Sequence, residues 1–141
     1  MSSTITNVSS QPHRLGRSIF ALFAGLLVIV VLSTATDAVM HATGIFPPAG
    51  QVMSDALFVL AFAYRVVESI FGSYITARLA PNRPIAHALI LGGVGVVFSL
   101  IGALVAWGDP SMGPLWYPLA LVLVALPCGW LGGVLYHKWY K

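Results

Sequence analysis

The chain has 141 residues, of which 58% are hydrophobic and 8% are charged, and its formal net charge is +3. Soluble domains carry roughly 25% charged residues, so this composition excludes a soluble globular domain. The apolar residues form long uninterrupted runs, which predict helices that cross a bilayer, and the basic residues beside those runs indicate membrane topology and argue against nucleic acid as a partner.

Residues 1–17 are rich in serine and threonine and end in Arg14 and Arg17. We expect a disordered tail with a basic stop at the membrane face. The first span then covers about 18–40. A cleavable signal peptide is the alternative interpretation, because a basic start, an apolar run and a small-residue Ser33-x-Ala35 site are all present. The helical pattern continues past that site to Met40, which favours a retained helix.

The second span is predicted at 55–80. Ser54 is a suitable N-cap, and Asp55 suits the positive end of the helix dipole. Pro81 ends the helix, because the residue before a proline is strained in helical geometry. The connection 81–84 is short, so the second and third spans must be antiparallel neighbours.

The third and fourth spans, at 85–106 and 116–136, are rich in small residues. Small side chains at steps of three and four share one helix face, and in lipid such a face lets a neighbouring helix approach closely. We therefore expect helix packing along Ala88, Gly92, Gly95, Ser99, Gly102 and Ala106 of the third span and along Gly129 and Gly133 of the fourth. Pro127 predicts a kink in the fourth span, because proline removes a backbone hydrogen bond.

The predicted fold is an all-α four-helix transmembrane bundle of two antiparallel hairpins, with residues 18–141 as one membrane domain. Tight packing is expected among the second, third and fourth spans. Basic residues precede the first span, flank the middle turn and follow the fourth span, whereas the other two loops have none. The positive-inside rule therefore places both termini in the cytoplasm.

Arg65 and Glu68 lie near the middle of the second span. At about 1.5 Å of rise per residue, Arg65 is roughly 15 Å below the start of its helix, and burying either charge there costs about 2.5–3.5 kcal/mol. Both must face the interior of the bundle. One interpretation is an ion pair within the helix, completed by hydroxyl or carbonyl groups. The other is a proton- or ion-coupling site in which Glu68 titrates and Tyr64 and Thr76 line a pathway.

Asp37 and His41 are four residues apart, hence on one face at the end of the first span. A carboxylate and an imidazole at this spacing can chelate a metal or relay a proton, and Asp55, Asp109 and Met53 could converge on them. Two ligands do not make a site, so we favour an Asp37–His41 hydrogen bond and predict no metal or other cofactor. Cys128 is the only cysteine and is expected in the core.

Two sequence motifs support a resemblance to other proteins. The residues 72–81 read Gly-x-Tyr-x-x-Ala-Arg-Leu-Ala-Pro and are followed by a glycine-rich third helix, and residues 126–133 read Leu-Pro-Cys-Gly-Trp-Leu-Gly-Gly. Over its second to fourth spans the chain resembles small uncharacterised bacterial four-helix membrane proteins. The resemblance implies an inner-membrane location and brings no known activity.

Two functions are consistent with these features. The first is a non-catalytic helix-packing, assembly or regulatory module, whose partners are the lipid bilayer and either further copies of the chain or a larger membrane complex. The second is a small ion- or proton-coupled transporter or channel that uses Arg65 and Glu68 and whose solute is unknown. No nucleotide-binding, zinc-protease or catalytic-triad motif is present in the sequence, so we do not expect an enzyme.

Overall fold

The computed structural model describes residues 11–48 and 50–140. Within these ranges the chain forms four α-helices and one short 3-10 helix, and no strand. The elements in order are α1 (Gln11–Ala42), α2 (Asp55–Leu79), α3 (Pro84–Ala106), η2 (Pro110–Met112) and α4 (Trp116–Trp139). All four α-helices are long and apolar enough to cross a membrane. The predicted all-α four-helix fold is confirmed, and the chain is a multi-pass membrane protein.

The helix bounds agree with the predicted spans except at the two ends of the chain. α1 begins at Gln11, so residues 11–17, predicted as part of a disordered tail, are helical. Pro12 is tolerated because the first turn of a helix needs no amide donor, and the single Gly16 weakens a helix without ending it. The rest of that tail, residues 1–10, lies outside the described residues. α4 extends three residues beyond 136, to Trp139.

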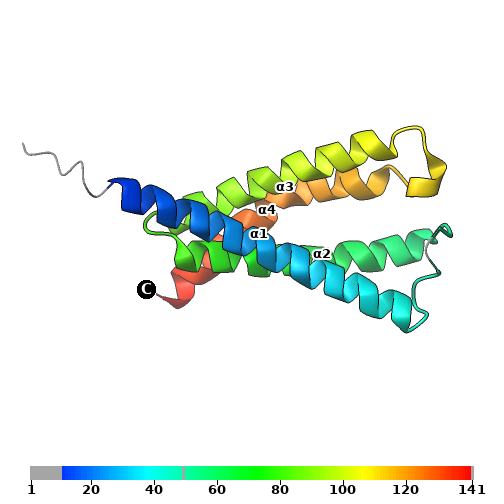
Figure 1. The fold of residues 1–141 in the computed structure, drawn as a ribbon, viewed down its shortest axis with the longest axis horizontal. Coiled ribbons are helices and arrows are strands. Elements are labelled where there is room, and N and C mark those ends of the chain that lie inside the picture. Colours follow the sequence, from blue (N-terminus) through cyan, green and yellow to red (C-terminus); the bar gives the residue numbers. More distant parts are fainter. Residues whose placement is uncertain (1–10, 49, 141) are drawn as a thin grey trace, which may run out of the picture.

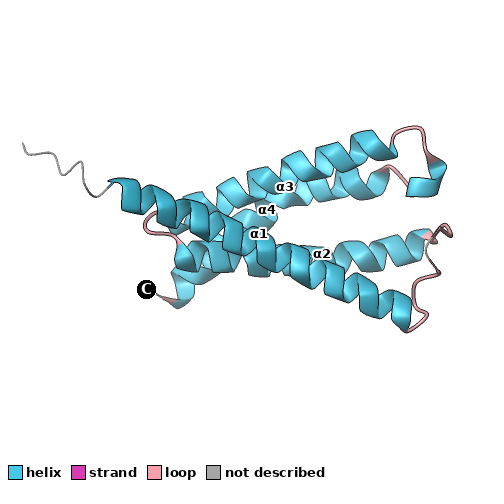
Figure 2. Cartoon of the chain, viewed as in Figure 1, coloured by secondary structure: helices cyan, strands magenta, loops and turns pink. Residues whose placement is uncertain are grey.

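The helices pair as two antiparallel hairpins, α1 with α2 and α3 with α4 (Figure 1). The turn between α2 and α3 lies at the same end as the start of α1 and the end of α4, which we call the terminal end (Figure 2). The other two connections lie at the opposite end, the loop end. The hairpins cross near the terminal end and diverge toward the loop end (Figure 1).

Glycine permits the close contact between α1 and α2. A Cβ placed on Gly25 would lie 2.7 Å from the carbonyl oxygen of Gly72, and one placed on Gly72 would lie 2.8 Å from that of Gly25. Backbone atoms cannot yield as a flexible side chain can, so these two positions let the helices touch along their backbones.

The second close contact holds α4 against its neighbours. A Cβ on Gly92 of α3 would lie 2.8 Å from the Ala125 carbonyl oxygen, and one on Gly129 would lie 2.7 Å from that of Ala88. Gly133 meets Ile85 in the same way, whereas Gly132, which the sequence analysis did not select, meets α2 at the Ile70 carbonyl oxygen. α4 therefore packs between α3 and α2 in the terminal half of the bundle, where the tight packing predicted among the second, third and fourth spans is found.

The predicted packing face of α3 is interrupted at Gly102, although Ala106 at the end of that face is buried. Gly95 has an ordinary contact with Ala125, but nothing lies within 4 Å of a Cβ placed on Gly102, which is exposed. Gly102 is thus not a packing residue within one chain, because it lines a cavity between α3 and α4.

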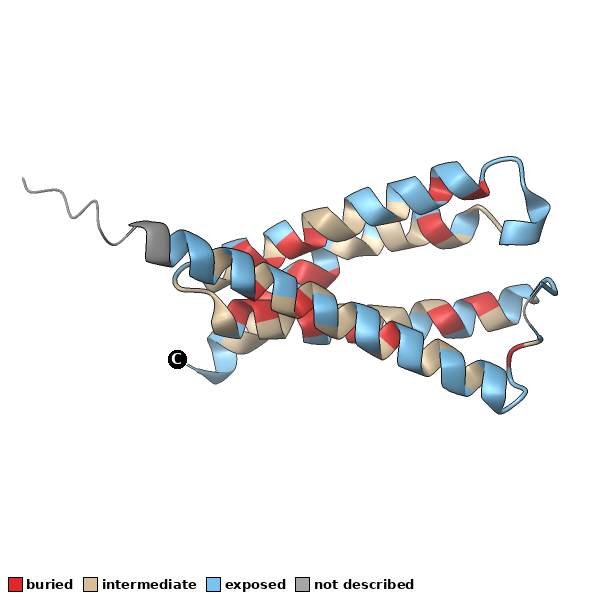
Figure 3. Ribbon diagram, in the orientation of Figure 1, coloured by how far each residue is buried: buried red, intermediate tan, exposed pale blue. Residues whose placement is uncertain are grey.

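Buried residues are concentrated where the helices cross and are sparser toward the loop end (Figure 3). The two hairpins still meet at the loop end, where the ring centroids of Phe58 and Tyr117 lie 5.2 Å apart and Trp116 donates a hydrogen bond to Asp55.

The outward faces of the helices are apolar. Leu104 of α3 is 73% exposed and Leu123 of α4 is 76% exposed, with many other large apolar side chains half exposed. Such a surface is stable in contact with acyl chains and would be unstable in water.

Candidate functional site

Polar side chains from α1 and α2 meet between the two helices, toward the loop end. α1 contributes Ser33, Thr36 and Asp37, and α2 contributes Tyr64, Arg65 and Glu68. Steps of three and four residues place each set on one helix face, and the antiparallel pairing turns the two faces toward each other. We call these six residues the polar cluster.

Arg65 is paired with Asp37. Its Nη2 donates to Asp37 Oδ2 over 2.6 Å, and the Tyr64 hydroxyl donates to Asp37 Oδ1. Among the described residues this is the one salt bridge, so the ion pair expected between Arg65 and Glu68 within α2 is not formed. Asp37 competes successfully because it faces Arg65 across the helix interface and presents both carboxylate oxygens to donors.

Glu68 is held by hydroxyl groups instead of a cation. Ser33 Oγ lies 2.8 Å from Glu68 Oε2, and Thr36 Oγ1 lies 2.7 Å from Glu68 Oε1. Glu68 is 8% exposed. Hydroxyl groups were predicted only to complete an ion pair between Glu68 and Arg65. They are instead the main hydrogen-bond partners of Glu68, and they come from the neighbouring helix α1.

Thr76, predicted to share this site, lies elsewhere. Its hydroxyl donates to the Ala21 carbonyl oxygen over 3.0 Å, and the residue is fully buried. Eight residues separate Thr76 from Glu68, which is about 12 Å along the helix. Thr76 therefore joins α1 to α2 near the terminal end and is not part of the polar cluster.

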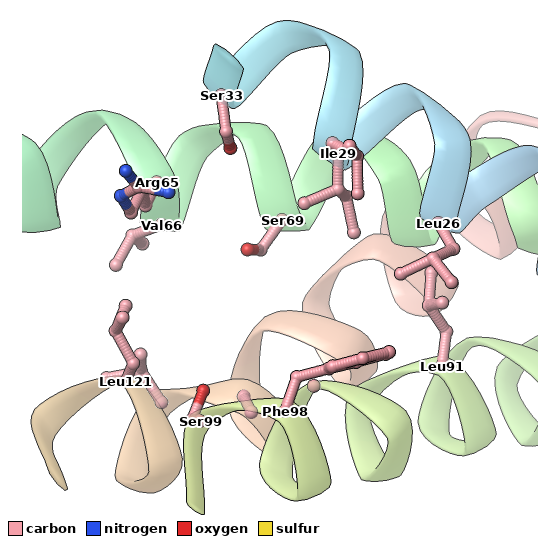
Figure 4. Close-up of a pocket in the computed structure, with 14 residues that line it drawn as sticks. Leu26, Ile29, Ser33, Arg65, Val66, Ser69, Leu91, Phe98, Ser99 and Leu121 are labelled. Carbon is pink, nitrogen blue, oxygen red and sulfur yellow. The ribbon is translucent and has the colours of Figure 1, made fainter. Parts of the chain in front are cut away.

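Two cavities border Arg65. The larger, of about 280 Å³, lies between the two hairpins, and we call it the hairpin cleft. Ser69 of α2 and Ser99 of α3 project into it from opposite sides, with Phe98 along one wall (Figure 4). Apart from these two serines, Ser33 and Arg65, its lining residues are apolar.

The smaller cavity, of about 120 Å³, lies on the loop-end side of Arg65, and we call it the loop-end cavity. Asp37, His41, Tyr64, Arg65 and Tyr117 supply its polar lining. Glu68 lines neither cavity. A small polar molecule or ion in the loop-end cavity would thus meet Arg65 and Asp37 before Glu68.

His41 and Asp37 share the wall of the loop-end cavity without bonding to each other. His41 Nδ1 lies 2.9 Å from the Pro47 carbonyl oxygen, and both Asp37 oxygens are occupied by α2. The predicted Asp37–His41 hydrogen bond is therefore wrong, because each group has a partner in better position.

The other acids near the loop end do not converge on this pair. Asp55 accepts a hydrogen bond from Trp116 Nε1 over 3.3 Å, and Asp109 caps η2 by accepting from the Ser111 amide and hydroxyl. In the described part of the chain no three His, Cys, Asp or Glu side chains form a group that could hold a metal ion.

The terminal end has its own polar contacts. His87 bridges two elements, with Nε2 2.9 Å from the Ser18 hydroxyl and Nδ1 3.1 Å from the Arg83 carbonyl oxygen. Arg17 donates to the Leu79 carbonyl oxygen over 3.3 Å. These contacts hold α1 to the α2–α3 turn. Cys128 is buried, as expected for a core residue.

Sequence analysis missed the face of α1 that meets α2. Its signal is a step of four residues, seen in Ala21, Gly25, Ile29, Ser33 and Asp37. The five positions drift slowly around the helix and form one continuous stripe of small and polar residues with a single large one. The same step on α2, from Glu68 through Gly72 to Thr76, would have suggested the pairing.

Comparison of the chain with models of protein families, with curated proteins and with solved structures found no match.

Proposed function

We propose that this protein is a non-catalytic membrane module of the plasma (inner) membrane that binds a further transmembrane helix, from a second copy or from a larger complex. The basic residues at the terminal end support an orientation with both termini in the cytoplasm. One observation carries the proposal: the small-residue face of α3 is open at Gly102, between Ser99 and the buried Ala106.

The open part of that face borders cavities in the membrane-spanning region. Ser99 lines the hairpin cleft and also a third cavity, of about 300 Å³, between α3 and α4. Gly102 lines this third cavity as well. Small residues bordering a groove allow close helix approach, which drives association in lipid through dispersion contacts. The first half of the same face shows this mode of packing against α4 at Gly92.

The hydrogen bonds within the polar cluster support the same proposal. The charged and hydroxyl groups bond across α1 and α2, and Glu68 does not border either cavity. Such bonds orient two helices without needing a solute.

The test compares the Gly102→Leu variant with the parent chain. Association between copies is measured by energy transfer between labelled chains in liposomes, and association with a larger complex by co-purification from native membranes. We expect association to be lost, because leucine fills the groove. Gly93→Leu is the matched control, since Gly93 also has nothing within 4 Å of its Cβ position and lines neither cavity. Equal association of both variants and the parent chain would refute the proposal.

A small ion- or proton-coupled transporter is the second candidate. The observation that favours it is the position of Arg65, which borders both the hairpin cleft and the loop-end cavity. Proteoliposome flux of protons and of small anions and cations, with the parent chain and with Glu68→Gln, tests this candidate. Flux that requires Glu68 would favour the transporter over the assembly module.

A further inference from the structure

The hydrogen bonds around Thr36 require more hydrogens than its hydroxyl has. Thr36 Oγ1 lies 2.7 Å from the Leu32 carbonyl oxygen and also 2.7 Å from Glu68 Oε1. A threonine hydroxyl has one hydrogen and can donate one well-aligned bond. If Glu68 were ionised, one of these two short contacts would join two acceptors with no hydrogen between them.

A proton on Glu68 Oε1 satisfies every group. Glu68 then donates to Thr36 Oγ1, and Thr36 donates to Leu32. Oε2 remains a carbonyl oxygen and accepts from Ser33 over 2.8 Å. The donors and acceptors form an unbroken chain from Ser33 to the α1 backbone.

Asp37 is in the opposite situation. Its two oxygens face the Tyr64 hydroxyl and the Arg65 guanidinium, which are both donors. A carboxylate with two donors is satisfied only when it carries no proton. Asp37 and Arg65 therefore form a neutral pair of opposite charges.

The charge balance of the cluster agrees with this assignment. Besides Glu68, the ionisable groups at the polar cluster and the loop-end cavity are Asp37 and His41 from α1, Tyr64 and Arg65 from α2, and Tyr117 from α4. The cationic side chain among them, Arg65, is already paired with Asp37. An ionised Glu68, at 8% exposure, would add an uncompensated negative charge inside the membrane.

We propose that Glu68 is a proton-binding site inside the membrane, protonated on Oε1 in this structure while Asp37, at the same helix interface, is ionised. The inference goes beyond the proposed function and does not depend on it. It assigns a ligand, one proton, to a site that holds α1 against α2.

The test is infrared spectroscopy of the purified full chain in lipid nanodiscs at neutral pH. We expect a carboxylic acid C=O stretching band that shifts in heavy water, persists in Asp109→Asn and disappears in Glu68→Gln. Ser33→Ala should move the band to higher frequency, because the carbonyl oxygen Oε2 loses its donor. A parent chain without the band, or a band that Ser33→Ala leaves unmoved, would overturn the assignment.

Thermal unfolding in detergent provides a second measurement. Glutamine copies the protonated acid, since its amide can donate to Thr36 and its carbonyl can accept from Ser33. Glu68→Gln should therefore unfold at the temperature of the parent chain, whereas Asp37→Asn should unfold at a lower temperature because Arg65 loses its counter-charge. Glu68→Gln unfolding at the lower temperature and Asp37→Asn at that of the parent would contradict the proposal.

Discussion

Arg65 Nη2 lies 2.6 Å from Asp37 Oδ2, so the guanidinium of α2 bonds to α1 although Glu68 lies three residues away on its own helix. This pair sets the register of the first hairpin near the loop end, as the Gly25–Gly72 contact does nearer the terminal end. Between the two contacts, Glu68 bonds to Ser33 and Thr36. From the loop end toward the terminal end, the first hairpin is thus held by an ion pair, then by hydrogen bonds from hydroxyl groups, and then by close contact of the two backbones.

The Asp37–Arg65 pair should show strong coupling in a double-mutant cycle. Loss of one partner, in Asp37→Asn or Arg65→Gln, should cost roughly 1–3 kcal/mol of unfolding free energy, between the values for exposed and for fully buried pairs, because the side chains are 33% and 29% exposed. The double variant should cost less than the sum of the two. Unfolding by denaturing detergent measures all three, and additive effects would show that the pair does not couple.

Gly25→Ala should separate α1 from α2. The added Cβ would lie 1.8 Å from Thr76 Oγ1 and 2.7 Å from the Gly72 carbonyl oxygen, and the second neighbour is backbone. We expect a loss of about 1–3 kcal/mol, typical of an overpacked core. Gly16→Ala on the same helix is the control, because nothing lies within 4 Å of its Cβ position. A loss of stability as large in the control would show that the contact with α2 is not the cause, because alanine is the better helix former.

Two adjacent glycines of α3 should respond in opposite ways to the same substitution. Gly92→Ala would bring a Cβ to 2.8 Å from the Ala125 carbonyl oxygen, whereas Gly93→Ala meets nothing within 4 Å. The first should lower the unfolding temperature. The second should maintain or raise it, because alanine is the better helix former. Circular dichroism in detergent micelles compares them, and a shared response would place the α3–α4 contact elsewhere.

The pKa of Asp109, in the loop before η2, should be below its ordinary value. The Ser111 hydroxyl and then the Ser111 amide stabilise the charged carboxylate by donating hydrogen bonds to it. A pKa that folding lowers stabilises the folded state above the ordinary value of 3.8 and ceases to do so as the pH falls through the lowered value.

Ser111→Ala should raise the Asp109 pKa part of the way back, because the amide donor remains. A carbon-13 NMR titration of the labelled aspartates measures this change. If the Asp109 pKa were unaltered in Ser111→Ala, the Ser111 hydroxyl would be excluded as the main cause of the lowered pKa.

The sequence by itself determined that four helices cross a membrane and nearly where each one begins and ends, except for the start of the first. Apolar runs of this length satisfy their backbone groups in lipid only as helices, and the prolines and glycines between the runs interrupt them. The terminal-end contacts of Gly92, Gly129 and Gly133 were predicted for the same local reason, since helical periodicity alone places small residues on one face.

Only the tertiary structure decided the partners of the charged side chains. Periodicity relates a residue to neighbours on its own helix, so it suggested Arg65 with Glu68 and Asp37 with His41. The observed bonds depend on the register between α1 and α2, which Gly25 and Gly72 set by letting the backbones touch. The exposure of Gly102 has a similar origin, because the separation of α3 and α4 at its level is a property of the packed helices and not of either one alone.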